Sequence, residues 1–306
     1  MKKHLITLIL FTTLILGGCV YIVWDSFLKP DETTKHKNLP EVTNYEIDMT
    51  HNTNAEGVSQ NRGTGTFTAM GDGPIDMETA QETIRAYAAE HGLSTAYYPD
   101  YLVSRMANNP ELEYFVLNYP LGNKNASSEE ISITRDISLA NGNVPFFLQW
   151  DERWGYTTYG NDLMGLTGCG PTVLSMVAVY LTGSYDYNPL YMAEYAMENG
   201  YYDYENSSGT FWSLMTTGAE NLGLTVNEVP GESDALIAAL EAGHPVIAIM
   251  GPGDFTSEGH FIVITGYNNG SVTVNDPNSI IRSEKTWPIN DVVEQANGLW
   301  EYSYND

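Results

Sequence analysis

The chain begins with a stretch of apolar residues that carries no charge. Residues 5–24 lack any charged side chain, and Lys2 and Lys3 precede them. A helix of about 20 apolar residues can cross the hydrocarbon core of a bilayer, and lysines beside it favour the cytoplasmic side. The pattern predicts that residues 1–28 anchor the protein in a membrane, with the rest of the chain outside the cytoplasm.

A second interpretation of this segment stays open. Residues 16–19, Leu-Gly-Gly-Cys, match a bacterial lipobox, in which Cys19 would be lipidated and become the mature N-terminus. The residues after Cys19 remain apolar, whereas a lipoprotein usually becomes polar there, so we favour a signal anchor that is not cleaved. In both cases the polar residues 29–62, with Pro30 and Pro40, are expected to form a flexible stalk.

Residues 63–130 are predicted to form an N-terminal arm. Along residues 63–70 the polarity of the side chains alternates as in a short strand, and residues 77–91 have the apolar spacing of an amphipathic helix. Residues 97–120 offer apolar faces for two short helices, interrupted near Pro110. Helices this short are unstable alone, so we expect the arm to pack on the domain that follows.

The main domain, residues 131–306, is expected to begin with helices and to continue with strands. An almost continuous apolar run favours a helix over residues 171–181. Further helices are predicted over residues 189–198, 210–222 and 233–242, and strands over residues 245–250, 260–267 and 271–275. Asn269-Gly270 is a dipeptide typical of a two-residue hairpin turn. Helices followed by an antiparallel sheet indicate an α+β fold.

Composition narrows the class of protein. Apolar residues make up 42% of the 306 residues and aromatic residues 12%, which is enough to bury a core. The formal net charge is -26. A chain this acidic has no basic surface to neutralise phosphates, so we exclude nucleic acid as a partner.

Cys169 is the candidate nucleophile. The other cysteine, Cys19, lies in the N-terminal apolar segment, so Cys169 has no disulfide partner in the main domain. It precedes the predicted helix that Pro171 begins, and a helix N-terminus favours the thiolate. Gly168 and Gly170 leave room for a substrate carbonyl and for a backbone N–H to face the developing oxyanion. Tight packing of a Gly-Cys-Gly helix entry is the alternative.

A nucleophilic thiol also needs a general base, and histidine is suited to this near neutral pH. Of the six histidines, His244 and His260 fall in the main domain. His244 lies in an Ala-Gly-His-Pro turn, where we expect a structural role. His260 follows Gly259 and opens a predicted strand, so it is the candidate base.

Two further polar residues complete the candidate site. Asp276 ends the strand that the hairpin pairs with the strand of His260, so it is placed to orient the imidazole. A simple turn is the alternative for Asp276, and Asn275 and Asn278 are weaker candidates for its role. Gln149 has apolar neighbours that would half bury its amide, which could join the oxyanion hole or serve the structure alone.

The candidate residues lie within motifs that occur in a recognisable order between about residues 143 and 301. The motifs are Asn143-Val-Pro-Phe-Phe-Leu-Gln-Trp-Asp-Glu-Arg-Trp, Tyr159-Gly160, Gly168-Cys-Gly-Pro-Thr, Gly259-His260 and Asn275-Asp-Pro-Asn278. In this order they resemble the papain-like family of bacteriocin-leader (double-glycine) peptidases, in its free-standing secreted bacterial branch. Residues 108–120 also resemble a stretch that precedes this domain in such secreted relatives.

The resemblance implies a papain-like α+β fold and a role for each candidate. Cys169 would be the nucleophile, His260 the base, Asp276 the orienting acid and Gln149 the oxyanion donor. In transporter-linked members this glutamine lies much closer to the cysteine, so the long insertion after Trp150 fits the free-standing branch better. The sequence contains no Gly-rich phosphate loop, so we do not expect an ATP-binding module or leader removal coupled to export.

The predicted function is a membrane-tethered, extracytoplasmic cysteine peptidase that cleaves peptides through a Cys169 thioester without a metal or cofactor. One alternative is a peptidoglycan amidase or endopeptidase, whose substrate would be a peptidoglycan peptide. The other is a non-catalytic surface-binding module that keeps the fold and binds through exposed aromatic residues. Its candidates are Trp150, Trp154, Tyr156, Tyr159, Tyr201, Tyr202 and Tyr204. The sequence does not indicate an oligomeric state.

Overall fold

The computed structural model describes residues 73–205 and 209–304. All of them belong to one compact unit, residues 68–306. The predicted membrane segment, the stalk and the strand over residues 63–70 lie outside the described residues. Among the helices that are described, none combines the length and the apolar character needed to cross a membrane.

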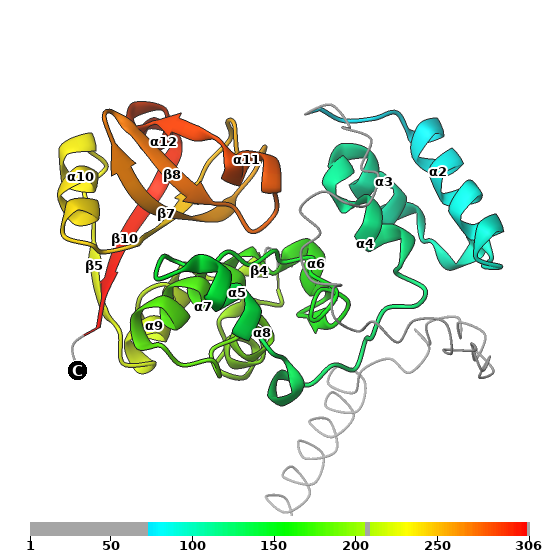
Figure 1. The fold of residues 1–306 in the computed structure, drawn as a ribbon, viewed down its shortest axis with the longest axis horizontal. Helices are drawn as coiled ribbons and strands as arrows, with labels where there is room; N and C mark the ends of the chain where they lie inside the picture. Colours follow the sequence, from blue (N-terminus) through cyan, green and yellow to red (C-terminus); the bar gives the residue numbers. More distant parts are fainter. Residues whose placement is uncertain (1–72, 206–208, 305–306) are drawn as a thin grey trace, which may run out of the picture. The chain divides into compact units, whose positions relative to one another are not determined.

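A six-stranded antiparallel sheet is the centre of the C-terminal part of the chain (Figure 1). Its strand order is β5-β10-β6-β7-β8-β9. The strands are β5 (Thr225–Glu228), β6 (Val246–Met250), β7 (His260–Asn268), β8 (Ser271–Asn275), β9 (Thr286–Pro288) and β10 (Ala296–Ser303). The sheet confirms the predicted strands β6, β7 and β8, whereas β5, β9 and β10 were not predicted.

The predicted hairpin joins β7 to β8. Asn269 and Gly270 have φ values of 49° and 85°, as the turn of a tight hairpin requires. The pairing runs from Asn268 opposite Ser271 to Val263 opposite Asn275. The residue after β8 therefore lies near the first residue of β7, which is where the sequence placed Asp276 and His260.

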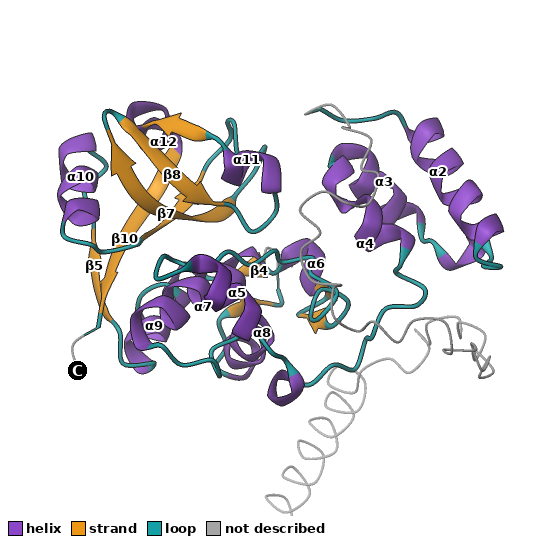
Figure 2. Cartoon of the chain, in the orientation of Figure 1, coloured by secondary structure: helices purple, strands orange, loops and turns teal. Residues whose placement is uncertain are grey.

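Helices cover both faces of the sheet (Figure 2). Successive residues of β6 and β7 face opposite sides of the sheet, as strand geometry requires. Ile247 and Val263 pack in one core cluster with α7 (Cys169–Thr182), α8 (Pro189–Glu198) and α9 (Thr217–Asn221). Neighbouring residues of the same strands pack in a second cluster with α10 (Ser233–Glu241) and α12 (Ile289–Gln295). The sheet is thereby buried on both sides.

Most of the predicted helices of the main domain are present, with one correction. The helix expected over residues 171–181 extends over Cys169–Thr182, and α8 and α10 match their predicted ranges closely. The single helix expected over residues 210–222 is wrong. Thr210 instead pairs with Tyr202 in a short hairpin of β3 (Tyr202–Asp203) and β4 (Gly209–Thr210).

The rest of residues 210–222 is divided between two short helical segments. A 3-10 turn, η5 (Trp212–Leu214), precedes α9. Thr216 between them has φ -110° and ψ -92°, which lies outside the helical region. The 3-10 turn and the helix bury their apolar residues in the same core cluster, so their apolar spacing resembles that of a single helix.

The N-terminal arm consists of helices around a core of their own. Its elements are α2 (Met77–Glu90), η2 (Thr95–Tyr97), α3 (Asp100–Asn108), η3 (Pro110–Leu112) and α4 (Glu113–Leu117). The segment that follows contains η4 (Ser128–Glu130) and α5 (Thr134–Ala140). The arm core also includes Tyr156, and Trp150, Leu163 and Leu166 pack against it. The arm therefore packs on the domain that follows it, as predicted.

Phe115 is central to this shared core, and its replacement is expected to be costly. Its side chain is buried and stacks on Tyr156 with ring centroids 4.6 Å apart. We expect Phe115→Ala to lower the free energy of unfolding by about 3–5 kcal/mol, the usual cost of an emptied aromatic site. Urea denaturation measures this loss. Tyr114→Ala, on the exposed side of the same helix, is the control and should change stability by about 0.5 kcal/mol at most. Equal denaturation midpoints for both variants would contradict the prediction.

The aromatic residues proposed for a binding surface are mostly core residues, so that expectation is wrong. Trp154, Tyr156, Tyr159, Tyr201 and Tyr202 are buried, and Trp150 packs half-buried against the arm core. Their rings fill space between elements, which is the common use of large apolar side chains. Only Tyr204 of this set is exposed.

Candidate active site

Cys169 is the first residue of α7, and its two glycine neighbours fit closely packed surroundings. A Cβ atom at Gly168 would lie 2.6 Å from the backbone oxygen of Met164, and one at Gly170 would lie 2.4 Å from Oγ1 of Thr210. The Gly-Cys-Gly entry therefore serves packing as well as access. Cys169 is a free cysteine, and the residue as a whole is neither fully buried nor fully exposed.

Cys169 and His260, the first residue of β7, lie close enough for each to shift the pKa of the other. Burial raises the pKa of the Cys169 thiol, but hydrogen bonding to His260 and the charge of His260 outweigh it. The backbone N–H groups of Phe261 and Gly170 lower this pKa further, so the net result is a pKa below that of an ordinary cysteine. The site thus favours a thiolate beside an imidazolium.

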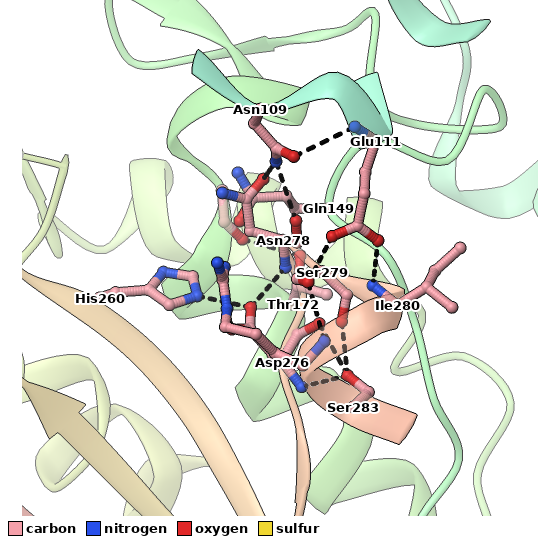
Figure 3. Close-up of polar contacts among 12 residues, drawn as sticks. Asn109, Glu111, Gln149, Thr172, His260, Asp276, Asn278, Ser279, Ile280 and Ser283 are labelled. Atoms are coloured by element: carbon pink, nitrogen blue, oxygen red, sulfur yellow. Dashed lines mark hydrogen bonds and ion pairs between the residues drawn. The ribbon is translucent and has the colours of Figure 1, made fainter. Parts of the chain in front are cut away.

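His260 lies between Cys169 and Asp276. Its Nε2 is 2.7 Å from Oδ1 of Asp276, which is fully buried (Figure 3). Burial alone would lower the pKa of His260, but the charge and the hydrogen bond of Asp276, together with the bond to Cys169, raise it to about 10. The imidazole is therefore held protonated, and its Nε2 is fixed by the Asp276 carboxylate.

Asp276 is held by three donors. Oδ1 accepts the backbone N–H of Asn278 at 2.8 Å in addition to His260, and Oδ2 accepts Nε of Arg282 at 2.5 Å. Burial raises the pKa of the Asp276 carboxyl, and the charges and hydrogen bonds of His260 and Arg282 lower it more strongly, so the net shift is downward. A carboxylate with these partners stays ionised and fixed in place.

Gln149 is buried beside this group. Its backbone N–H donates to the carbonyl oxygen of Pro277 at 2.8 Å, and its Nε2 donates to the carbonyl oxygen of Gly165 at 3.0 Å. Oε1 has no hydrogen-bond partner among the described residues. Since a side-chain amide carries two N–H donors, the bond to Gly165 leaves one of them for a further acceptor.

The structure brings Cys169, His260 and Asp276 together and gives the weaker candidates other partners. His244 pairs with Glu301, with 3.2 Å between Nδ1 and Oε2. Asn275 donates its side-chain amide to the carbonyl oxygens of Val144 and Pro145. Asn278 touches Asp276 through its backbone N–H, which supports the carboxylate rather than replacing it.

Arg282 and Glu111 belong to this group and were not predicted. Arg282 lies in α11 (Ile280–Glu284), a short helix whose cap residue is Ser279. The carboxylate of Glu111, from the N-terminal arm, accepts bonds from the start of this helix. A helix start signal at Ser279 was the available hint. In the described part of the chain, no group of three or more His, Cys, Asp or Glu side chains is placed to hold a metal ion.

A cysteine at the start of a helix, beside a histidine that a buried carboxylate holds, is typical of hydrolases that use a cysteine nucleophile. The model of the Peptidase_C39-like family matches residues 142–305, more than half of the chain. The chain belongs to this family, and it is a cysteine peptidase. The resemblance seen in the sequence is thereby confirmed, whereas the assignment of roles to single residues stays a prediction.

Two solved structures are similar to this chain. One is described as a C39-like peptidase from Bacillus anthracis; it is 18% identical, with a TM-score of 0.37, and the match covers 54% of this chain and 96% of that one. The other is the peptidase domain of Streptococcus ComA, a bifunctional ABC transporter involved in a quorum-sensing pathway; it is 20% identical, with a TM-score of 0.36, and the match covers 46% of this chain and 93% of that one. No curated protein matches significantly.

Proposed function

We propose that this protein is a membrane-tethered, extracytoplasmic peptidase in which Cys169 attacks the peptide carbonyl. The observation that carries the proposal is the position of His260, which bonds to Asp276 and lowers the pKa of the Cys169 thiol. The Cys169 thiolate forms a bond to the carbonyl carbon, and the imidazolium of His260 gives its proton to the leaving amine. Water, deprotonated by His260, then cleaves the thioester and releases the acid.

In the same proposal, the oxyanion of the tetrahedral intermediate is bound by Gln149 and by the start of α7. The amide of Gln149 has a donor left after its bond to Gly165. The first N–H groups of an α-helix have no partners within the helix, so they can face the oxyanion. Asp276 takes no proton in this scheme and holds His260 in place.

The membrane tether is supported by the sequence of residues 1–28. A run without charges after Lys2 and Lys3 is long enough to span a bilayer, which would place the peptidase outside the cytoplasm. The intact mass of the protein extracted from membranes tests which anchor is used. A mass that includes residues 1–18 supports the signal anchor. Loss of these residues with added lipid on Cys19 supports the lipoprotein alternative, and loss without lipid excludes both.

The substrate is best tested by offering two candidates side by side. The protein and its Cys169→Ala variant are incubated with a peptide that contains a double-glycine leader sequence and, separately, with purified peptidoglycan. Cleavage of the peptide by the protein but not by the variant supports the proposed peptidase. Release of wall fragments alone would overturn it in favour of the peptidoglycan hydrolase.

A further inference from the structure

Glu111 of the N-terminal arm makes direct contacts with the loop that follows β8. Its Oε2 accepts the backbone N–H of Ile280 at 2.6 Å and that of Ile281 at 3.1 Å. Its Oε1 accepts the hydroxyl of Ser279. Figure 3 shows the Glu111 side chain reaching from the arm to Ser279 and Ile280. One carboxylate of the arm thus binds three donors at the start of α11.

The segment that Glu111 binds carries the partners of Asp276. Arg282 of α11 donates Nε to Oδ2 of Asp276. Ser283, in the next position, accepts the backbone N–H of Asp276 at 2.9 Å and donates to the carbonyl oxygen of Ser279 at 2.7 Å. A shift of α11 would therefore move both the charge beside Asp276 and the backbone of Asp276 itself.

A second arm residue holds the same loop. The side-chain amide of Asn109 donates to the carbonyl oxygen of Asn278 at 3.1 Å, and its Oδ1 accepts the backbone N–H of Glu111 at 3.2 Å. Asn278 in turn donates its backbone N–H to Oδ1 of Asp276. Oδ1 of Asp276 is therefore linked through Asn278 to Asn109, and Oδ2 is linked through α11 to Glu111.

We propose that Glu111 is a positioning residue of the peptidase, which fixes Asp276 and through it His260, so that the arm completes the active site. The inference rests on the roles proposed above for Cys169, His260 and Asp276. Glu111 lies outside residues 142–305, which the family model matches. The matched segment alone therefore lacks a part of its own active site.

Alkylation of Cys169 by iodoacetamide, followed from about pH 5 to pH 10, tests this. When Asp276 is displaced, it stabilises the imidazolium of His260 less, so the thiolate forms at higher pH. In Glu111→Ala we expect the rising limb of the rate profile to move up by about half a pH unit, and the rate near pH 6 to fall about threefold. Glu111→Gln keeps one acceptor oxygen, so its rate profile should lie between those of Glu111→Ala and the wild type. If Glu111→Ala does not fold, Glu111→Gln takes its place in the test.

Two control variants separate positioning from general support. Glu113→Ala removes a carboxylate from the same part of the arm, and Leu102→Ala opens the arm core, where Leu102 is fully buried. Both should keep the wild-type alkylation profile, although Leu102→Ala lowers stability. The proposal would be overturned if both Glu111 variants had the alkylation profile of the wild type. It would also be overturned if the profile of Leu102→Ala shifted as far as that of Glu111→Ala. If the wild type itself alkylated like an ordinary thiol, the proposed catalytic roles would fail instead.

Discussion

In His260→Ala, alkylation of Cys169 near pH 6 should be slower by about 10- to 100-fold, a factor of ten for each unit by which the thiol pKa rises. The hydrogen bond and the charge of His260 hold the pKa of Cys169 below its ordinary value, against the burial that raises it. Without His260 the burial remains, and the thiolate is scarce at this pH. Peptide cleavage should fall further, by about 10²- to 10⁴-fold, because the leaving amine also loses its proton donor.

The pH dependence of the wild type follows from the same two groups. Cleavage should begin as the pH rises and Cys169 loses its proton. Because the pKa of Cys169 is lowered, this happens at a lower pH than for an ordinary thiol. It should decline as the pH rises through about 10, where His260 loses the proton that it gives to the leaving group. The imidazolium–thiolate pair exists between these limits, and a rate profile without this window would contradict it.

His244→Ala is the matched control for His260→Ala. It removes the other histidine of the main domain, which is paired with Glu301. Its alkylation rate and its cleavage rate should both equal those of the wild type. Equal alkylation of His260→Ala and the wild type would show that Cys169 is not activated by His260, and would favour a protein that keeps the fold without the chemistry.

The sequence allowed the central part of the site to be predicted because local signals determine it. Asn269-Gly270 fixes the hairpin, and the hairpin brings Asp276 to the end of the strand that His260 begins. The long apolar run after Cys169 fixes α7 and the position of Cys169 at its start. These are short-range patterns, a turn dipeptide and an apolar helix, and such patterns survive folding with little change.

The positions of Arg282 and Glu111 could not be predicted, because they depend on contacts between residues far apart in the sequence. α11 has only 5 residues, too few for an apolar period, so Arg282 gave no sign of its position beside Asp276. Glu111 reaches this helix across 169 positions of the chain. A glutamate that faces solvent and a partly buried glutamate that caps another helix look alike in sequence, since only tertiary packing distinguishes them.

Strand β10, which lies between β5 and β6, was not predicted for a related reason. β10, Ala296–Ser303, alternates irregularly, because Asn297 and Gly298 interrupt its start and the pairing with β6 shifts there. Its central residues Leu299, Trp300 and Tyr302 are buried on both faces. A strand buried on both faces loses the alternation of apolar and polar residues that marks a half-buried strand.

Gln149→Ala separates turnover from thiol reactivity, which His260→Ala does not. Peptide cleavage passes through an oxyanion, and loss of one oxyanion donor lowers kcat by about 10²- to 10³-fold. Alkylation by iodoacetamide displaces iodide and forms no oxyanion, so Gln149→Ala should be alkylated at the wild-type rate. The measurement is kcat on the peptide that the wild type cleaves, beside the alkylation rate of the same sample.

The lost bond of Gln149 to Gly165 also reduces stability, so the control must lose a comparable bond elsewhere. Asn188 is a buried amide that donates to the carbonyl oxygen of Ser128 at 3.0 Å. Asn188→Ala should lower the free energy of unfolding by about 1 kcal/mol or more and leave kcat unchanged. If Gln149→Ala lost kcat only as much as Asn188→Ala, or lost alkylation in parallel with kcat, the Gln149 amide would be a structural support of the loop rather than a donor to the oxyanion.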